Sequence, residues 1–136
     1  MITNFSISIT FLFLFTLSLE SQTIRDQSGA LKGRIDEQGT VRDASGRLLG
    51  RIDDYGNVRD AAGRLKGRID SRSNVKDGAG RHIGRVVNGT VRDASGRLLG
   101  RMDADGSVRD ASGRLIGRTD GVRKEHAVAF FFFFFR

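Results

Sequence analysis

The chain has 136 residues without cysteine or proline, and its 23 basic and 16 acidic side chains give a formal net charge of +7. Without cysteine there are no disulfides and no lipid-bearing cysteine, so stability must come from packing and strand pairing. About 115 residues follow the apolar start of the chain, which fits a single domain. A basic domain of this kind favours polyanionic partners.

The first 21 residues contain an apolar and hydroxyl-rich run from Phe5 to Leu19, which is followed by Glu20 and Ser21. This length is typical of a signal-peptide core and is short for a membrane-spanning helix. We expect residues 1–21 to be a signal peptide that directs the protein to the periplasm, the outer-membrane surface or the medium. An uncleaved anchor is the alternative, because the first residues carry no Lys or Arg. Removal of Glu20 with the signal would raise the charge to +8.

From residue 24 onward, one phrase recurs at steps of mostly seventeen residues. Each copy reads V-R-D, a small pair, G-R-L-x-G-R-I-D, and a turn that ends in Gly. A short fixed period predicts a stacked or radial repeat architecture, and short β-favouring runs between Gly and Asx turns predict strands. The copies begin at Ile24, Val41, Val58, Val75, Val91, Val108 and, as a partial copy, Val122.

The turns differ in length but preserve one cross-strand pair. Asn88-Gly89 is a strong two-residue hairpin signal and places Val86 opposite Val91. A three-residue loop with Gly56 in the left-handed conformation pairs Ile52 with Val58. The last turn, Asp120-Gly121, would pair Thr119 with Val122. We infer that burial of this apolar pair determines the register of every hairpin.

The inner face of each predicted hairpin carries a Gly between two apolar residues, as in Leu48, Gly50 and Ile52. The register places Asp60 opposite Gly50, so we expect Asp60 and its equivalents to point inward and accept N–H groups of the next turn, as Asx-turns do. Three medium apolar side chains per hairpin form a thin core, so no hairpin is stable alone. Radial packing of five or six hairpins solves this, with residues 23–26 and 122–125 as the strands that close the ring.

The iterated G-R-L-x-G-R-I-D-x-x-G-x-V-R-D-x-S-G resembles the five-fold β-flower family of small secreted bacterial proteins, from residue 23 to about 125. The resemblance implies a radial all-β array of antiparallel hairpins and export, without an established activity. We therefore predict a signal peptide (1–21), a β-hairpin repeat domain (22–125) and a Phe-rich tail (126–136). The chain departs from the family in hairpin count, since five full hairpins are followed by a truncated sixth.

The tail contains six consecutive phenylalanines, Phe130, Phe131, Phe132, Phe133, Phe134 and Phe135. In water this run would be an aggregation hazard, and it is too short to span a bilayer as a helix. One interpretation is that the tail plugs the axis of the array and supplies the core that the repeats lack. The other is a tail that docks on a membrane or a partner, or assists envelope assembly.

The predicted register also places like charges opposite each other on the outer face. The pairs are Arg34–Arg42, Arg51–Arg59, Arg68–Lys76, Arg85–Arg92, Arg101–Arg109 and Arg118–Arg123. Opposed like charges destabilise a sheet, and a bound polyanion would compensate them, because guanidinium groups match phosphate, sulfate or carboxylate oxygens. Alternatively, these side chains splay onto neighbouring Asp and Glu or onto carbonyls at the rim.

An acidic glycan or lipid phosphate is the expected partner. Nucleic acid is disfavoured, since Tyr55 is the only aromatic residue in the repeats. We expect no enzyme, no cofactor and no metal: His82 and His126 have no visible catalytic partner, and the sister loops of Asp103–Gly106 do not repeat its acidic ligands. Conspicuous residues that occur about six times indicate structure or multivalent binding.

Overall fold

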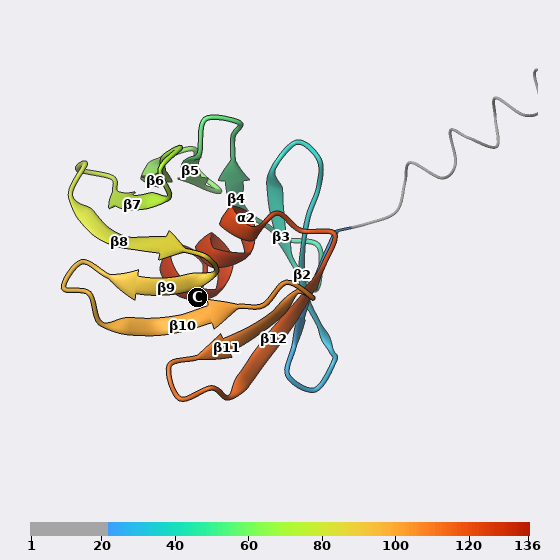
Figure 1. Ribbon diagram of the computed structural model, residues 1–136. Helices are drawn as coiled ribbons and strands as arrows, with labels where there is room; N and C mark the ends of the chain where they lie inside the picture. The colour runs from blue at the N-terminus through green and yellow to red at the C-terminus, as the bar shows by residue number, and fades with distance from the viewer. Residues whose placement is uncertain (1–21) are drawn as a thin grey trace, which may run out of the picture.

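The computed structural model describes residues 22–136, so the predicted signal peptide lies outside the described residues. The described part contains twelve antiparallel strands in a closed ring, in which each strand pairs with its neighbours in sequence and β1 closes onto β12 (Figure 1). The predicted radial all-β array is confirmed, with six hairpins. The strands are β1 (Thr23–Asp26), β2 (Leu31–Ile35), β3 (Thr40–Asp43), β4 (Leu48–Ile52), β5 (Asn57–Asp60), β6 (Leu65–Ile69), β7 (Asn74–Asp77), β8 (His82–Val87), β9 (Thr90–Asp93), β10 (Leu98–Met102), β11 (Ser107–Asp110) and β12 (Leu115–Asp120).

Closure of the ring differs from the sequence-based expectation. Strand β12 pairs with β1, which places Ile24 opposite Thr119. The predicted pair of Thr119 with Val122 and the predicted strand over residues 122–125 are therefore wrong. After Gly121 the chain turns into the ring as helix α2 (Lys124–Val128) and π-helix η1 (Ala129–Phe133). The first strand of the chain thus completes the truncated sixth hairpin.

The loops define two rims of the ring. We call the end formed by the loops at residues 36–39, 53–56, 70–73, 88–89 and 103–106 and by residues 120–123 the entry rim, because α2 enters there. The opposite end, formed by the turns at 27–30, 44–47, 61–64, 78–81, 94–97 and 111–114, is the exit rim. The register predicted for the entry-rim loops is confirmed at Ile52–Val58 and Val86–Val91.

Entry-rim loops also join neighbouring hairpins. The N–H of Ile52 donates to the carbonyl of Gly39 in the preceding hairpin at 2.8 Å, and Gly39 has φ +84°. A Cβ on Gly39 would collide with the Ile52 carbonyl, so glycine is required here by both space and conformation. Equivalent bonds recur around the ring and fix the distance between hairpins.

The core consists of the ring's inner face and the tail. Buried Ile and Val side chains such as Val41 and Val58 face inward, and the small residues Ala127, Val128 and Ala129 are buried with them. The expectation that Leu48 shares this inner face with Gly50 is wrong: the strand register shifts between the two residues, and Leu48 is exposed while Leu49 packs against the core. Towards the exit rim the strands contribute small residues and the tail contributes large ones: glycines line the inner face of the ring, and phenylalanine side chains fill the space beside them. The two layers are therefore complementary in volume, as close-packed interiors require.

Each of the six phenylalanine rings lies against the inward glycine of one hairpin. The nearest ring carbon would be 2.5–3.2 Å from a Cβ built on that glycine. The partners are Phe130 with Gly33, Phe131 with Gly117, Phe132 with Gly100, Phe133 with Gly84, Phe134 with Gly67 and Phe135 with Gly50. Consecutive residues thus face consecutive hairpins, and the six rings pass once around the inside. The tail from residue 124 to 135 is hereafter the plug.

The backbone of the plug explains this one-to-one match. An α-helix completes a turn in 3.6 residues, too few to distribute six neighbours over six hairpins. The plug is wider: the Phe134 N–H donates to the Ala129 carbonyl at 2.8 Å, an i to i+5 bond. Phe134 caps the C-terminal end of this π-helix with φ −115°. In residues 22–136 no helix is long and apolar enough to span a membrane.

Candidate functional site: an arginine belt on the outside of the ring

Five of the six predicted cation pairs lie directly opposite each other on the outer face of their hairpins. They are Arg34–Arg42, Arg51–Arg59, Arg68–Lys76, Arg85–Arg92 and Arg101–Arg109. All these residues except Arg109 are exposed, and Arg109 is partly so. Alternation along the strand explains this, because their neighbours Gly and Val point into the ring.

The sixth predicted pair, Arg118–Arg123, is wrong. Arg118 faces Arg25 of β1, since β1 occupies the position that the truncated repeat leaves vacant. Arg123 instead lies at the entry rim, where the chain turns into the plug. Arg25 was not predicted from the sequence, although Ile24-Arg25-Asp26 is a copy of the V-R-D motif that supplies Arg59 and its equivalents. The belt therefore contains Arg25, Arg34, Arg42, Arg51, Arg59, Arg68, Lys76, Arg85, Arg92, Arg101, Arg109 and Arg118.

One member of most pairs bends towards the exit rim. The Nη1 of Arg42 donates to the Gly46 carbonyl at 3.0 Å, four residues along the chain. Arg25, Arg59, Arg92 and Arg109 make the same bond to Gly29, Gly63, Gly96 and Gly113. Each bond uses one donor of a guanidinium that has five, so the rest of the charged group remains free to meet a ligand.

The opposite member is held less uniformly. Arg51 donates through Nε to the Gln38 carbonyl at 3.3 Å, whereas Arg101 forms an ion pair with Asp103 at 2.9 Å. Asp103 also forms an ion pair with Arg109. Hydrogen bonds from the guanidinium groups of Arg101 and Arg109 lower the pKa of the Asp103 carboxyl. Within residues 22–136, no ion pair involves Arg34, Arg68, Arg85 or Arg118. The belt thus relieves its own repulsion through rim carbonyls and one carboxylate, and most of its charge stays uncompensated.

The turn aspartates do not balance the belt. The Oδ1 of Asp60 accepts the N–H groups of Ala62 and Arg64, both at 2.9 Å, which confirms the predicted Asx-turn chemistry. These bonds and the Arg64 guanidinium hold the pKa of Asp60 below its ordinary value. Asp60 lies opposite Gly50, as predicted, but the space on the inner face beside Gly50 is occupied by the Phe135 ring.

The six phenylalanines that could have formed a docking tail lie inside the ring. Phe130, Phe131, Phe132 and Phe134 are buried, and Phe133 and Phe135 are partly buried near the exit rim. Two lysines cover this end: Lys66 Nζ donates to the Phe134 carbonyl at 2.7 Å and lies 5.6 Å from the centre of the Phe135 ring. Lys32 lies similarly over Phe131, at 5.8 Å.

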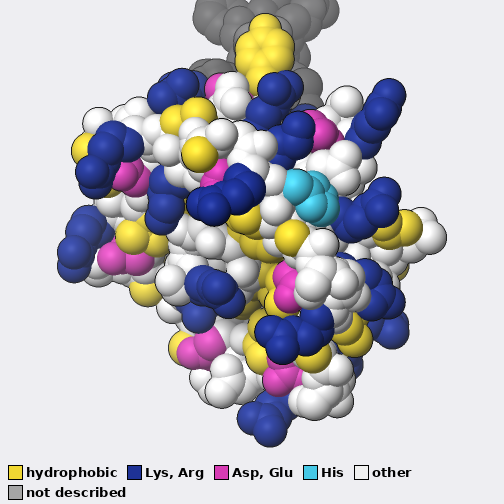
Figure 2. All heavy atoms as spheres, turned by 90° about the vertical axis from the view of Figure 1, so that its left-hand side faces the viewer, with side chains coloured by type: hydrophobic (Ala, Val, Ile, Leu, Met, Phe, Trp, Pro, Cys, Tyr) yellow, Lys and Arg dark blue, Asp and Glu magenta, His cyan; other side chains and the backbone are white. Residues whose placement is uncertain are grey.

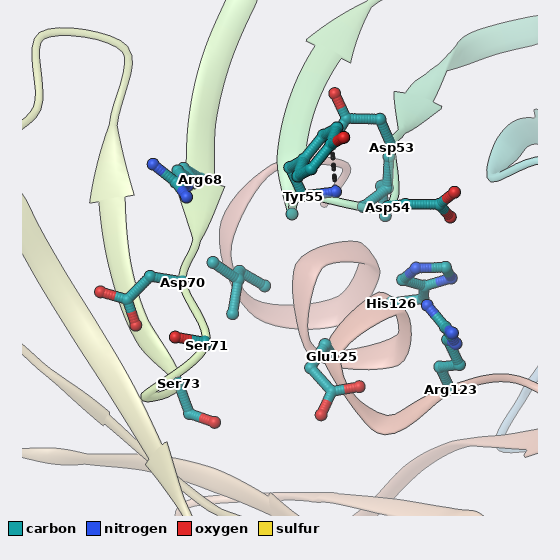
Figure 3. Close-up of a pocket in the computed structure, with 13 residues that line it drawn as sticks. Asp53, Asp54, Tyr55, Arg68, Asp70, Ser71, Ser73, Arg123, Glu125 and His126 are labelled. Atoms are coloured by element: carbon teal, nitrogen blue, oxygen red, sulfur yellow. Dashed lines mark hydrogen bonds between the residues drawn. The ribbon is translucent and has the colours of Figure 1, made fainter.

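A pocket of about 350 Å³ opens at the entry rim between the loops at 53–56 and 70–73 and the start of α2 (Figure 3). His126 lines it beside Arg123 and near Asp54, and its Nδ1 is buried without a hydrogen-bond partner in the described part of the chain. Burial lowers the pKa of His126 and Arg123 lowers it further, while Glu125 and Asp54 oppose the shift. Sequence reasoning assigned His126 to packing or solvent, and the helical tail buries it.

This pocket carries both signs of charge, because the lining also includes Asp53, Asp70 and Arg68. Asp53 and Asp70 are occupied by N–H groups of their own turns. Among residues 22–136 no group of three or more His, Cys, Asp or Glu could hold a metal ion. The belt, rather than this pocket, is the larger concentration of one charge on the molecule.

Comparison with known proteins adds the family and no further relative. The family model described as 5-fold beta-flower protein matches residues 18–135. Neither the search of curated proteins nor the search of solved structures gave a match.

Proposed function

Since the chain belongs to the 5-fold beta-flower protein family, we propose that this member is an exported, non-enzymatic module that binds anionic ligands through the outer arginine belt. The observation that carries the proposal is the register, which aligns like charges across five hairpins and across the β1–β12 closure. Such pairs cost stability unless something compensates them. A polyanion with regularly spaced charges would do so at several hairpins at once.

The chemistry of the belt favours phosphate, sulfate or carboxylate groups. Guanidinium forks bind these groups with paired hydrogen bonds, and belt residues such as Arg34, Arg68 and Arg85 have no ion pair within residues 22–136 to give up. Acidic glycans and lipid phosphates both present these oxygens in series. Binding at several hairpins raises avidity without a deep pocket.

A function carried by an exposed phenylalanine tail receives less support. The plug is the centre of the core, and its release would expose the six rings and the inner glycines together. We therefore assign the plug to folding and the belt to binding.

The belt is testable with two variants of equal charge. The first carries Arg34→Gln, Arg68→Gln, Arg85→Gln and Arg118→Gln. The matched control carries Arg47→Gln, Arg64→Gln, Arg81→Gln and Arg97→Gln, whose guanidinium groups lie 3.1–3.8 Å from turn aspartates outside the belt. Both lose four charges.

The measurement is the salt concentration at which each protein leaves a heparin column. The belt variant should elute at a clearly lower concentration than the control, because salt screens contacts that the control retains. Equal shifts for the two variants would show that heparin senses only net charge and would overturn the proposal.

A further inference from the structure

The two rims of the ring expose different charged groups to the outside. At the entry rim and in the first two residues of α2, nine acidic residues lie against three cations, Arg72, Arg123 and Lys124. The acidic residues are Asp36, Glu37, Asp53, Asp54, Asp70, Asp103, Asp105, Asp120 and Glu125. An anionic surface would therefore be repelled by this end of the molecule.

The exit rim presents guanidinium groups to the outside. Its Arg and Asp residues form pairs, such as Arg64–Asp60 at 3.1 Å, but the two partners differ in exposure. In the four pairs the Arg side chains are 78–82% exposed and the Asp side chains 23–29%. The carboxylates face their own turn N–H groups, so an approaching surface meets the cations first. Five belt arginines also reach the Gly carbonyls of these turns.

The same rim exposes leucines at one repeated position. Leu48, Leu65 and Leu98 are 38%, 44% and 37% exposed, and each is the first residue of a strand that rises from an exit-rim turn. Leucine occupies this position in five of six repeats, with His82 in the other. Further partly buried hydrophobic side chains pack against the core, among them Leu49, Ile83, Leu99, Ile116, Phe133 and Phe135. Figure 2 shows this face, with hydrophobic side chains between Lys and Arg.

We propose that the exit rim docks on the surface of an anionic lipid bilayer, with the leucines in the headgroup boundary and the arginines on lipid phosphates. Exposed leucines next to long cationic side chains are typical of surfaces that bind at the membrane interface. Each cation near an anionic bilayer adds to the attraction. A soluble polyanion would use the arginines but not the leucines. The acidic entry rim then faces away from the membrane, and most of the belt stays free around the side.

This inference goes beyond the proposed function, because it depends on exit-rim residues rather than the belt. Its first variant carries Leu48→Ser, Leu65→Ser and Leu98→Ser. The matched control carries Tyr55→Ser and Val87→Ser, which remove the large exposed apolar side chains of the entry rim, 77% and 49% exposed. Thermal unfolding establishes that each variant is folded.

The measurement is partition onto vesicles of phosphatidylcholine with and without phosphatidylglycerol, by co-sedimentation. We expect the wild-type protein to bind only the anionic vesicles. The leucine variant should lose roughly tenfold or more in vesicle affinity, because apolar burial sets interfacial affinity. The entry-rim control should partition like the wild-type protein. The two charge variants should differ in opposite directions in the two measurements. The variant with Arg47→Gln, Arg64→Gln, Arg81→Gln and Arg97→Gln should lose more vesicle binding, whereas the belt variant should lose more heparin retention.

Three outcomes would overturn the inference. They are no binding of the wild-type protein to anionic vesicles, equal binding by the leucine variant, and self-association that the leucine substitutions abolish. The last would show that the exit rim contacts a second copy of the chain rather than a bilayer. None of them bears on the heparin comparison, so failure here and failure of the belt proposal are distinguishable.

Discussion

The inside and the outside of the ring use the same six-fold repeat in different ways. Inside, each phenylalanine has one glycine, so each contact depends on the hairpin geometry around it. Outside, the same cation pair occurs on each hairpin. A local difference, such as Lys76 in place of Arg or the ion pair of Arg101 with Asp103, changes one pair and leaves the others as they are. Close packing makes the interior sensitive to single atoms, whereas solvent screening makes exterior charges individually weak. Interior changes should therefore affect folding, and exterior changes should affect binding in small steps.

The largest expected effect follows from removal of the plug. A chain that ends after Glu125 loses six phenylalanines, and truncation of even one such side chain to Ala typically costs about 3–5 kcal/mol. Several such losses exceed the total stability of a typical domain, about 5–15 kcal/mol. We expect no cooperative thermal transition by circular dichroism and an expanded species by size exclusion. A compact, cooperatively unfolding truncated chain would show that the hairpins are stable without the plug.

The next test changes the number of hairpins. Deletion of residues 47–63 removes one repeat, including β4, β5 and Gly50, the partner of Phe135. Five hairpins cannot enclose six rings without overpacking, which costs about 1–3 kcal/mol or more. Deletion of Phe135 in the same chain should raise the melting temperature above that of the repeat deletion alone. In the intact chain the same deletion should lower it, which is the control. A fall in both backgrounds would contradict a plug matched to hairpin number.

A smaller effect is expected from one added methyl group. A Cβ on Gly117 would lie 2.6 Å from two carbons of the Phe131 ring and 2.7 Å from the Arg25 carbonyl, so Gly117→Ala should lose about 1–3 kcal/mol by overpacking. Phe131→Leu should recover part of the loss, while Phe134→Leu, which faces Gly67, should only add to it. Urea denaturation measures both cycles. Additivity in the first cycle would refute contact between Gly117 and Phe131.

The smallest effect concerns pH. The folded pKa of His126 lies below its ordinary 6.5, so its contribution to stability is present above pH 6.5 and is lost as pH falls through the folded pKa. The turn aspartates, whose pKa values lie below 3.8, lose theirs only at lower pH. We expect the melting temperature to fall between pH 7 and pH 5, and His126→Leu to reduce this fall. An unchanged pH profile in the variant would show that the pKa of His126 is the same in the folded and the unfolded protein.

Local chemistry made much of the ring predictable. The Asn88-Gly89 turn and the left-handed Gly56 set the register of their hairpins, which in turn aligns Arg51 with Arg59. A hairpin is closed by residues that are near in sequence, so its turn residues suffice to predict its pairs. The Asx-turn role of Asp60 was predictable for the same reason.

Two of the errors arise at non-local contacts. Nothing near Arg118 indicates that its partner is Arg25, because the two residues meet only when the ring closes. The place beside Gly50 was assigned to Asp60, yet Phe135, 85 positions away in sequence, occupies it. Arg25, the belt residue that was not predicted from the sequence, belongs to the strand that closes the ring.

The sequence by itself determined the repeat, the hairpin register, the turn chemistry and the family. The tertiary structure alone decided that the ring has six hairpins, that β1 rather than the end of the repeat closes it, and that the phenylalanines form its core. The physical reason is the separation in sequence between the residues that determine each feature. Turn conformation and strand alternation depend on residues a few positions apart, whereas ring size depends on filling one shared interior, which no single repeat can specify.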